Sequence, residues 1–293
     1  MDFKKLQQNF NSSGIEEFLG LSPNDMHSIL YHPADTFEDV VYFNKKTNID
    51  LIKNTLVAKH IEKFLSMIGT KGVKATQNGN LPLKIVNEFH NDFTSKPSEM
   101  KYHAPSEDYC RQTLAFRKLI IKCGWVKKQH SKFLLTKKGE AILENGISQS
   151  EYLKFLNIWL FEYNWAFTDG YSACKLLQTS AFFCFYILHV KANETIYEND
   201  FVNLYLKAFP MVLDEINDNP YVSRKKDDEL KSIIQLRFFE RFCEYFGLAK
   251  IEEKEKIYPR HESNHKIIIT DLFQELFIWF DPKKQHNTNE NLN

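Results

Sequence analysis

The sequence predicts a mainly α-helical protein with small β-hairpins. Three observations predict this class: glycine and proline are scarce (10 and 9 residues), phenylalanine and tyrosine are abundant (25 and 13), and apolar residues recur at helical spacing over most of the chain. A turn-rich β fold would need more glycine and proline. Against this helical background, one layout occurs twice: a helix, a glycine, two short strands and a second, capped helix.

Residues 1–50 are expected to form an N-terminal helical arm. Apolar residues at helical spacing predict a helix over 1–20 that ends at Gly20. Ser22 can cap a second helix over 23–31, because proline is tolerated at the first helical position. Residues 40–43 form either a short strand or an extended arm that lies on the next domain.

Residues 51–147 are expected to form a basic winged-helix-like unit. The predicted elements are, in order, an amphipathic helix over 49–68, a short strand over 73–76, a helix from residue 80, a third helix over 107–123 and a hairpin over 125–135. Ser106 is the expected cap of the third helix, and Thr136 the cap of a closing helix. The hairpin has apolar ends and a basic tip.

Residues 148–281 are expected to hold an aromatic central helix and a second winged-helix-like unit. Aromatic side chains surround the helix predicted over 150–167, which favours burial between two bodies over a ligand-stacking role. The remaining predicted elements are helices over 173–190, 200–209, 227–246 and 271–280, a strand over 194–197 and a hairpin over 247–269. Residues 282–293 are expected to be a disordered tail.

The second unit is interpreted as a divergent duplicate of the first. Aligning Gly124 with Gly247 places Phe116 opposite Phe239, and Thr136 matches Thr270 if the second hairpin is longer. The two units are therefore expected to lie in tandem around the aromatic central helix.

Charge is unevenly distributed although the net charge of the chain is zero. Residues 1–50 carry 4 lysines and arginines against 8 acids, residues 51–146 carry 17 against 8, and residues 147–293 carry 17 against 22. A segment with a net charge of +9 inside a neutral chain suggests a polyanionic partner. The competing interpretation is that these lysines are solvated and face the acidic flanks of the same molecule.

Nucleic-acid binding is the leading hypothesis for the basic segment. Lysine and arginine on a helix face and an adjoining wing would neutralise phosphates and release counterions. The candidate residues of the third helix, the wing and the helix after it are Arg111, Lys118, Lys122, Lys127, Lys128, Lys132, Lys137 and Lys138.

Two features count against sequence-specific readout of DNA. The connection over 93–106 is far longer than the turn of a helix-turn-helix motif. Glu107 and Asp108 stand at the start of the third helix, where base-reading residues usually lie, and they would repel phosphates. Residues 172–280 have a net charge of −3, so the second unit is expected to serve as a protein-interaction or dimerisation module.

Several strings resemble an uncharacterised bacterial protein family over nearly the whole chain. They are Gly20-Leu21-Ser22-Pro23 with Met26-His27, Gly79-Asn80-Leu81-Pro82, Asn164-Trp165 with Asp169-Gly170-Tyr171, the run 208–215, and Arg241-Phe242 with the run 246–249. Related chains are sometimes fused to a plasmid-type domain or a small SEC-C zinc motif, and neither extension is visible here. The resemblance implies no established activity, so it transfers no catalytic residue.

Other functional classes have little support in the sequence. There is no glycine-rich phosphate loop, serine-hydrolase elbow or zinc-protease motif. His261 and His265 fall on a predicted hairpin tip, where their spacing does not align the two rings, and the cluster Asp35, Glu38 and Asp39 is better explained as a solvated loop. We therefore expect no catalytic residue, metal or cofactor.

The expected compartment is the cytoplasm. No signal peptide or membrane-spanning run is visible, and five cysteines without a Cys-x-x-Cys pair suit reduced, buried thiols. The sequence thus favours a non-catalytic nucleic-acid-binding or regulatory protein that contacts DNA or RNA. The alternative is a protein-interaction or scaffold module without nucleic-acid contact, or a homodimer formed through the second unit.

Overall fold

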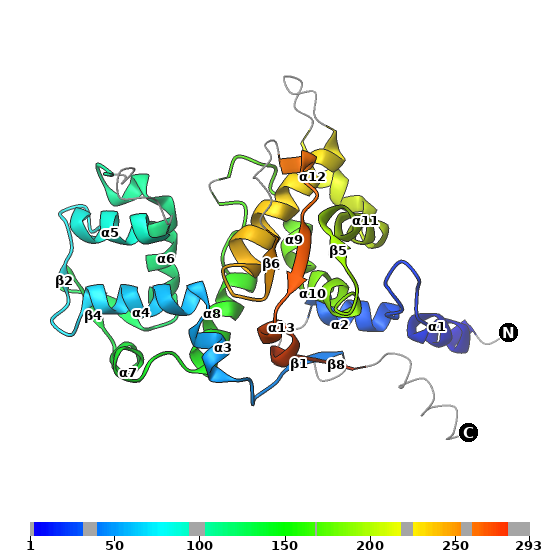
Figure 1. Ribbon diagram of the computed structural model, residues 1–293, viewed down its shortest axis with the longest axis horizontal. Coiled ribbons are helices and arrows are strands. Elements are labelled where there is room, and N and C mark those ends of the chain that lie inside the picture. The colour runs from blue at the N-terminus through cyan, green and yellow to red at the C-terminus, as the bar shows by residue number, and fades with distance from the viewer. Residues whose placement is uncertain are drawn as a thin grey trace. The chain divides into compact units, whose positions relative to one another are not determined.

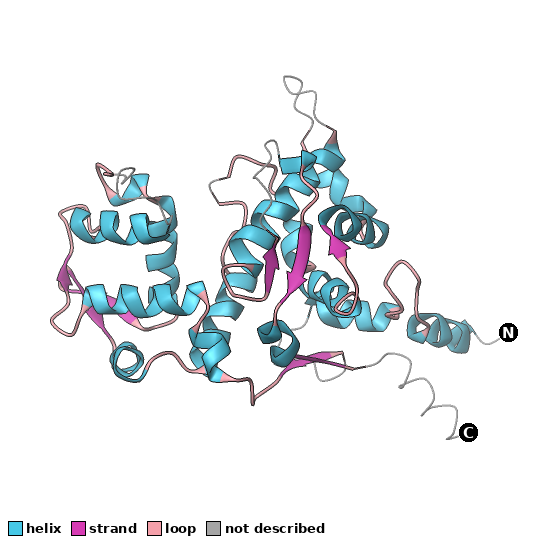
Figure 2. Ribbon diagram, in the orientation of Figure 1, coloured by secondary structure: helices cyan, strands magenta, loops and turns pink. Residues whose placement is uncertain are grey.

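The computed structural model describes residues 3–31, 40–93, 103–167, 169–217, 225–252 and 260–280. These residues are mainly α-helical, with small antiparallel sheets of two or three strands (Figure 2). The chain divides into two compact units: residues 49–164, and residues 1–48 together with 165–293. We call them the basic unit and the composite unit. The sequence had suggested a boundary at 147/148.

The basic unit consists of helices and one three-stranded sheet (Figure 1). Its elements are α3 (Ile49–Lys53), α4 (Leu56–Ile68), β2 (Val73–Lys74), α5 (Leu83–Phe93), η3 (Glu107–Tyr109), α6 (Arg111–Lys122), β3 (Val126–Gln129), β4 (Lys132–Leu135), α7 (Lys137–Asn145) and α8 (Gln149–Phe161). Phe64 of α4, Phe89 of α5 and Phe116 of α6 pack with ring centroids 4.9 to 5.6 Å apart. This cluster joins the three helices at the centre of the unit.

The predicted aromatic central helix belongs to the core of the basic unit. Phe155 of α8 lies 5.5 Å from Phe116 and stacks at 6.0 Å on Trp125, as measured between ring centroids. The helix begins with a capping box, in which Ser148 accepts a hydrogen bond from the Glu151 backbone and donates one to its carboxylate. The helix ends at Phe161 and not at residue 167, and Phe161 is 50% exposed. Packing within this unit therefore accounts for Tyr152, Phe155 and Trp159, whereas Trp165 belongs to the composite unit.

Two predicted helices of the basic unit have different boundaries. The helix expected over 49–68 is divided at Thr55, whose hydroxyl caps α4 by accepting a bond from the Ala58 amide at 3.2 Å. The third helix begins at Arg111 and not at residue 107, because Cys110 leaves the helical conformation between η3 and α6. Ser106 forms no capping bond, contrary to the prediction.

The composite unit surrounds a helix that is buried along nearly its whole length. Its elements are α1 (Phe3–Ser12), α2 (Pro23–Tyr31), β1 (Val41–Phe43), α9 (Lys175–Thr179), α10 (Ala181–Val190), β5 (Ile196–Tyr197), α11 (Glu198–Ala208), η4 (Pro210–Glu215), α12 (Lys226–Ile233), η5 (Ile234–Cys243), β6 (Ala249–Ile251), η6 (Arg260–Glu262), β7 (Lys266–Ile269), α13 (Asp271–Leu276) and β8 (Phe277–Trp279). Residues 181–188 of α10 are all buried. The helix predicted over 227–246 continues from α12 into the π-helix η5.

A two-stranded sheet joins the two chain segments that form the composite unit. β1 pairs antiparallel with β8, and Val41 lies opposite Trp279. The strand expected at 40–43 is therefore present, whereas the helix expected over 271–280 ends at Leu276. The first helix ends at Ser12, well before the predicted end at Gly20. The acidic cluster at 35–39 and the tail at 282–293 lie outside the described residues.

The same order of helix, strand, two helices and hairpin occurs in both units. The strand orders of the two three-stranded sheets, β2-β4-β3 and β5-β7-β6, correspond. Val73 pairs with Phe133 in the first sheet, and Ile196 pairs with Ile267 at the equivalent place in the second. The residue intervals between these pairs match the alignment that the sequence suggested, so the two sheets also correspond in backbone register.

The end of the third helix is also the same in both copies. Gly124 and Gly247 have φ of 74° and 71°, a left-handed conformation that favours glycine. The hydroxyl groups of Thr136 and Thr270 each donate to the carbonyl of the matching glycine at 2.7 Å. Each threonine also caps the closing helix, α7 or α13. These contacts confirm both predicted caps.

All five cysteines are free and buried, as expected. Burial raises the pKa of Cys123 to about 12 and that of Cys174 to about 11. These thiols therefore serve as core residues in the native fold.

Candidate nucleic-acid interface

All eight predicted phosphate-contacting residues are exposed on the basic unit. Arg111, Lys118 and Lys122 follow one side of α6, while Ala115, on the same stripe, is buried. The other five lysines lie on the hairpin β3–β4 and the first turn of α7. The basic stripe predicted on the third helix thus faces solvent.

Two of the eight cations are engaged by neighbouring groups. Lys122 forms an ion pair with Glu162, which follows α8, and both side chains remain about half exposed. Lys128 donates to the Gly79 carbonyl at 2.8 Å, and its ammonium lies 5.7 Å from the centre of the Phe133 ring. Exposed ion pairs are weak and are screened by salt, so Lys122 can exchange Glu162 for a phosphate at small cost.

Glu107 does not face solvent, although the sequence suggested that it would repel phosphates. Its side chain is buried and receives two hydrogen bonds from Arg117, at 2.7 and 3.0 Å. A third bond comes from the Leu81 amide at 3.1 Å. The charge of Glu107 is therefore neutralised inside the unit, and it ties η3 to α6 and to the start of α5.

This pair could have been anticipated in part from the sequence. Helical spacing places Arg117 on the apolar side of the third helix, and a buried arginine requires a buried acid. The partner lies ten residues earlier, across the break at Cys110, so the periodicity of one continuous helix could not identify it.

Asp108 is the one member of the acidic pair that remains exposed. Its carboxylate accepts a hydrogen bond from the Asn80 side chain at 3.1 Å. The neighbouring Tyr109 is 67% exposed, directly before the first turn of α6. The groups exposed to solvent at this end of α6 are therefore the Asp108 carboxylate, the Tyr109 ring and the Arg111 guanidinium.

The tip of the hairpin is a tight two-residue turn. His130 and Ser131 both have positive φ, 49° and 55°, as hairpin turns of this length require. The Ser131 carbonyl accepts a hydrogen bond from Ala75 at 2.8 Å, which extends the pairing of β2 with β4. The basic hairpin is thus a short element that is paired on both strands.

The equivalent helix face in the composite unit is covered. The residues that correspond to Arg111, Ala115, Lys118 and Lys122 are Ile234, Phe238, Arg241 and Tyr245. Three of these four are buried and Arg241 is half-buried. Trp165 covers this side of the helix, with its ring 5.2 Å from that of Phe242.

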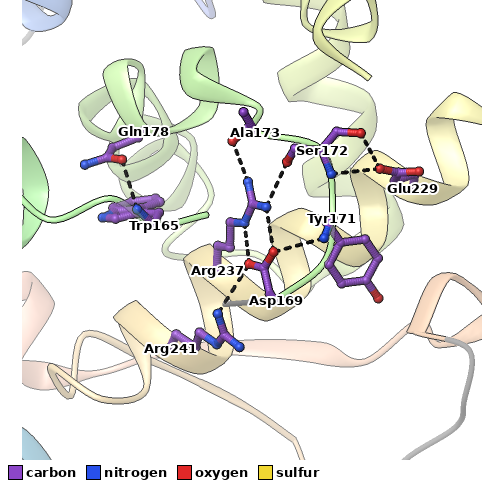
Figure 3. A network of polar contacts seen from close by, with 9 residues as sticks. All are labelled: Trp165, Asp169, Tyr171, Ser172, Ala173, Gln178, Glu229, Arg237 and Arg241. Carbon is purple, nitrogen blue, oxygen red and sulfur yellow. Dashed lines mark hydrogen bonds and ion pairs between the residues drawn. The ribbon is translucent and has the colours of Figure 1, made fainter. Parts of the chain in front are cut away.

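The segment 165–173 is held on this helix by a buried polar network (Figure 3). Arg237 donates two hydrogen bonds to Asp169, at 2.7 and 2.9 Å, and one each to the carbonyls of Ser172 and Ala173. Arg241 reaches the same carboxylate at 3.3 Å. Glu229 accepts bonds from the Ser172 amide and hydroxyl. Arg237 and Arg241 thus both form their polar contacts with groups inside the composite unit.

The chain matches no protein-family model, no curated protein and no solved structure. Among the described helices, none is both long and apolar enough to cross a bilayer. Within the same described ranges, no group of three histidine, cysteine, aspartate or glutamate residues could hold a metal ion.

Proposed function

We propose that the basic unit is a winged-helix module that binds nucleic acid through phosphate contacts from α6 and the hairpin β3–β4. This proposal rests on the different burial of positive and negative side chains in the basic unit. The predicted cations are exposed, whereas Glu107, the acid expected to oppose them, is buried against Arg117. A surface of this kind neutralises phosphates and releases counterions.

The repeated topology supports a tandem winged-helix architecture with divided roles. The order of helices and the pairing of three strands match in both units, as we expect of two winged helices in tandem. The third helix is open and basic in one copy and covered in the other. We therefore assign nucleic-acid contact to the basic unit and a structural or protein-binding role to the composite unit. Reduced, buried thiols suit work in the cytoplasm.

In this function the protein is regulatory and carries out no catalysis. Phosphate contacts position a protein on nucleic acid without reading its sequence. The long connection between α5 and η3 and the exposed Asp108 both disfavour base readout by the start of α6. The expected ligand is therefore DNA or RNA recognised mainly through its backbone.

One observation favours the alternative function, a protein-interaction module. In the composite unit the third helix receives an acidic side chain, Asp169, from a non-helical loop. Arg241, which bonds it, corresponds to Lys118 of the basic unit. An acidic peptide bound to Lys118 of α6 would therefore form the same kind of contact that Asp169 forms with Arg241 in the composite unit.

Fluorescence anisotropy of labelled duplex and single-stranded DNA against the full chain tests the proposal. Binding should weaken steeply between about 50 and about 200 mM salt. Replacing Lys118, Lys122, Lys127 and Lys128 with alanine should lower both the affinity and the slope against salt. Alanine at the exposed Lys59 and Lys84, on α4 and α5, should change the affinity much less. Flat titrations at low salt would refute nucleic-acid binding and favour the acidic-peptide alternative.

A further inference from the structure

The outer face of the sheet β2-β4-β3 carries one lysine on each strand. Lys74 on β2 lies directly opposite Lys132 on β4, and Lys127 on β3 lies on the same face opposite Leu134. Alternation places Phe133 and Leu135 on the buried side, so Lys132 and its neighbours point outward. Neighbouring strands are about 4.8 Å apart, so the three lysines form a diagonal row about 10 Å wide, in which Lys127 is displaced by two residues along the sheet from Lys74 and Lys132.

This row concentrates positive charge without a compensating acid. All three lysines are exposed, and no carboxylate of the described residues forms an ion pair with them. Like charges directly opposite each other on adjacent strands destabilise a sheet. A bound anion would convert this repulsion into attraction, and a polyanion with regularly spaced charges would do so for all three lysines at once.

We propose that Lys74, Lys127 and Lys132 form a second phosphate-contacting face, separate from the α6 stripe, that takes the sugar–phosphate backbone of a nucleic acid. This inference rests on the proposed function and adds Lys74 to it. Lys128 is not part of this second face, because its side chain lies on the opposite side of the sheet and donates to Gly79.

The duplicated sheet of the composite unit supplies a matched comparison. The residues equivalent to Lys74, Lys127 and Lys132 are Tyr197, Lys250 and Lys266. Tyr197 removes the opposed pair of lysines, and the exposed Ile268 adds apolar surface at the place of Leu134. The second sheet therefore has two of the three lysines but no lysine at the position of Lys74. Lys250 and Lys266 are thus suitable control positions.

The test measures binding of a short labelled duplex by the full chain in three variants. The sheet variant carries glutamine at Lys74, Lys127 and Lys132, the helix variant carries it at Arg111, Lys118 and Lys122, and the control carries it at Lys250 and Lys266. We expect the sheet variant to bind about tenfold more weakly and to lose about 0.9 in log–log salt slope for each phosphate contact removed. The control should bind like the unmodified chain.

A charge reversal separates loss of contact from loss of fold. Lys74→Glu places a carboxylate opposite Lys132, so it should raise the thermal midpoint at low salt while lowering DNA affinity. A structural defect would lower both quantities, and that result would overturn the inference.

The remaining outcomes distinguish the two proposals. If the unmodified chain binds the duplex and only the helix variant weakens it, the sheet face is refuted and the proposed function stands. If the unmodified chain fails to bind DNA or RNA at low salt, the proposed function fails. Binding to phosphatidylserine vesicles that depends on the three sheet lysines, without DNA or RNA binding, would overturn the assignment to nucleic acid.

Discussion

Arg237 and Asp169 form a doubly hydrogen-bonded ion pair whose side chains are 1% and 0% exposed. The pair joins the π-helix η5 to a segment that lies 68 residues earlier in the chain. It fixes segment 165–173 over the helix face that corresponds to the basic stripe of α6. The third helix of the composite unit is therefore covered on this face, whereas the same face of α6 in the basic unit is exposed.

Removing one partner of this pair should strongly destabilise the composite unit. Asp169→Ala leaves the Arg237 guanidinium buried without its acid, which should cost about 3–5 kcal/mol of unfolding free energy. The double variant Asp169→Leu, Arg237→Met should cost less than Asp169→Ala alone. Urea unfolding followed by circular dichroism measures both.

An exposed pair in the same unit provides the control for this prediction. Lys191 and Glu194 pair at 2.8 Å, with side chains 29% and 60% exposed. Lys191→Ala should therefore cost only about 0–1 kcal/mol. Equal losses for Lys191→Ala and Asp169→Ala would show that burial of the Arg237 pair does not determine its contribution.

Asp108 should oppose nucleic-acid binding, whereas Glu107 should not. Asp108 is exposed beside α6, so Asp108→Asn should raise DNA affinity about two- to threefold at low salt, and the gain should fade as salt screens the charge. Asparagine retains an oxygen that can accept the hydrogen bond from Asn80. Anisotropy titrations at two salt concentrations measure the effect.

Asp50→Asn removes the same charge from an exposed site on α3 and should leave the affinity nearly unchanged. If Asp108→Asn has no effect either, the first turn of α6 does not approach the phosphates. That result would confine the contact to the later turns of the helix and to the hairpin.

Gly139 should be less tolerant of alanine than Gly124. A Cβ atom at Gly139 would lie 2.1 Å from the Trp125 carbonyl oxygen, a backbone atom that cannot move without shifting the hairpin. Gly139→Ala should therefore cost about 3 kcal/mol or more. At Gly124 the space is open, so alanine should cost only the strain of positive φ, about 1–2 kcal/mol. A Gly139→Ala variant as stable as the unmodified chain would contradict this close approach.

The stability of the composite unit should contain a contribution from Glu198 that decreases as pH rises. Burial raises the pKa of Glu198 above its ordinary value of about 4.5, although Ser263 and His265 donate hydrogen bonds to one carboxylate oxygen. The other oxygen is buried and has no hydrogen-bond partner among the described residues. Between the unfolded and folded pKa values the native state holds the proton that the unfolded state has released, so this contribution is lost over that window.

Glu198→Gln removes this titration. We expect the variant to gain stability relative to the unmodified chain as pH rises from about 4.5 through the folded pKa. Urea unfolding at successive pH values measures this difference. Glu144→Gln, at an exposed site on α7, should show no such trend. A constant difference between Glu198→Gln and the unmodified chain at every pH would contradict the prediction.

Features that depend on a few neighbouring residues were predictable from the sequence. The start of α2 after Ser22, the caps at Thr136 and Thr270, and the turns at Gly124 and Gly247 all follow from local hydrogen bonds or from φ preferences. The correspondence between the two units was also predictable, because equivalent turns and caps recur in the same order. The mainly α-helical class and the exposure of the basic stripe follow from periodicity alone.

Partners that are distant in the chain were decided only by the tertiary structure. No local pattern indicates that Glu107 is buried by Arg117, that β8 pairs with β1, or that Asp169 accepts hydrogen bonds from Arg237. The physical reason is that helical spacing specifies which side of an element is apolar, but not which segment covers that side. The same exposed or buried position can therefore serve opposite roles, as the third helices of the two copies demonstrate.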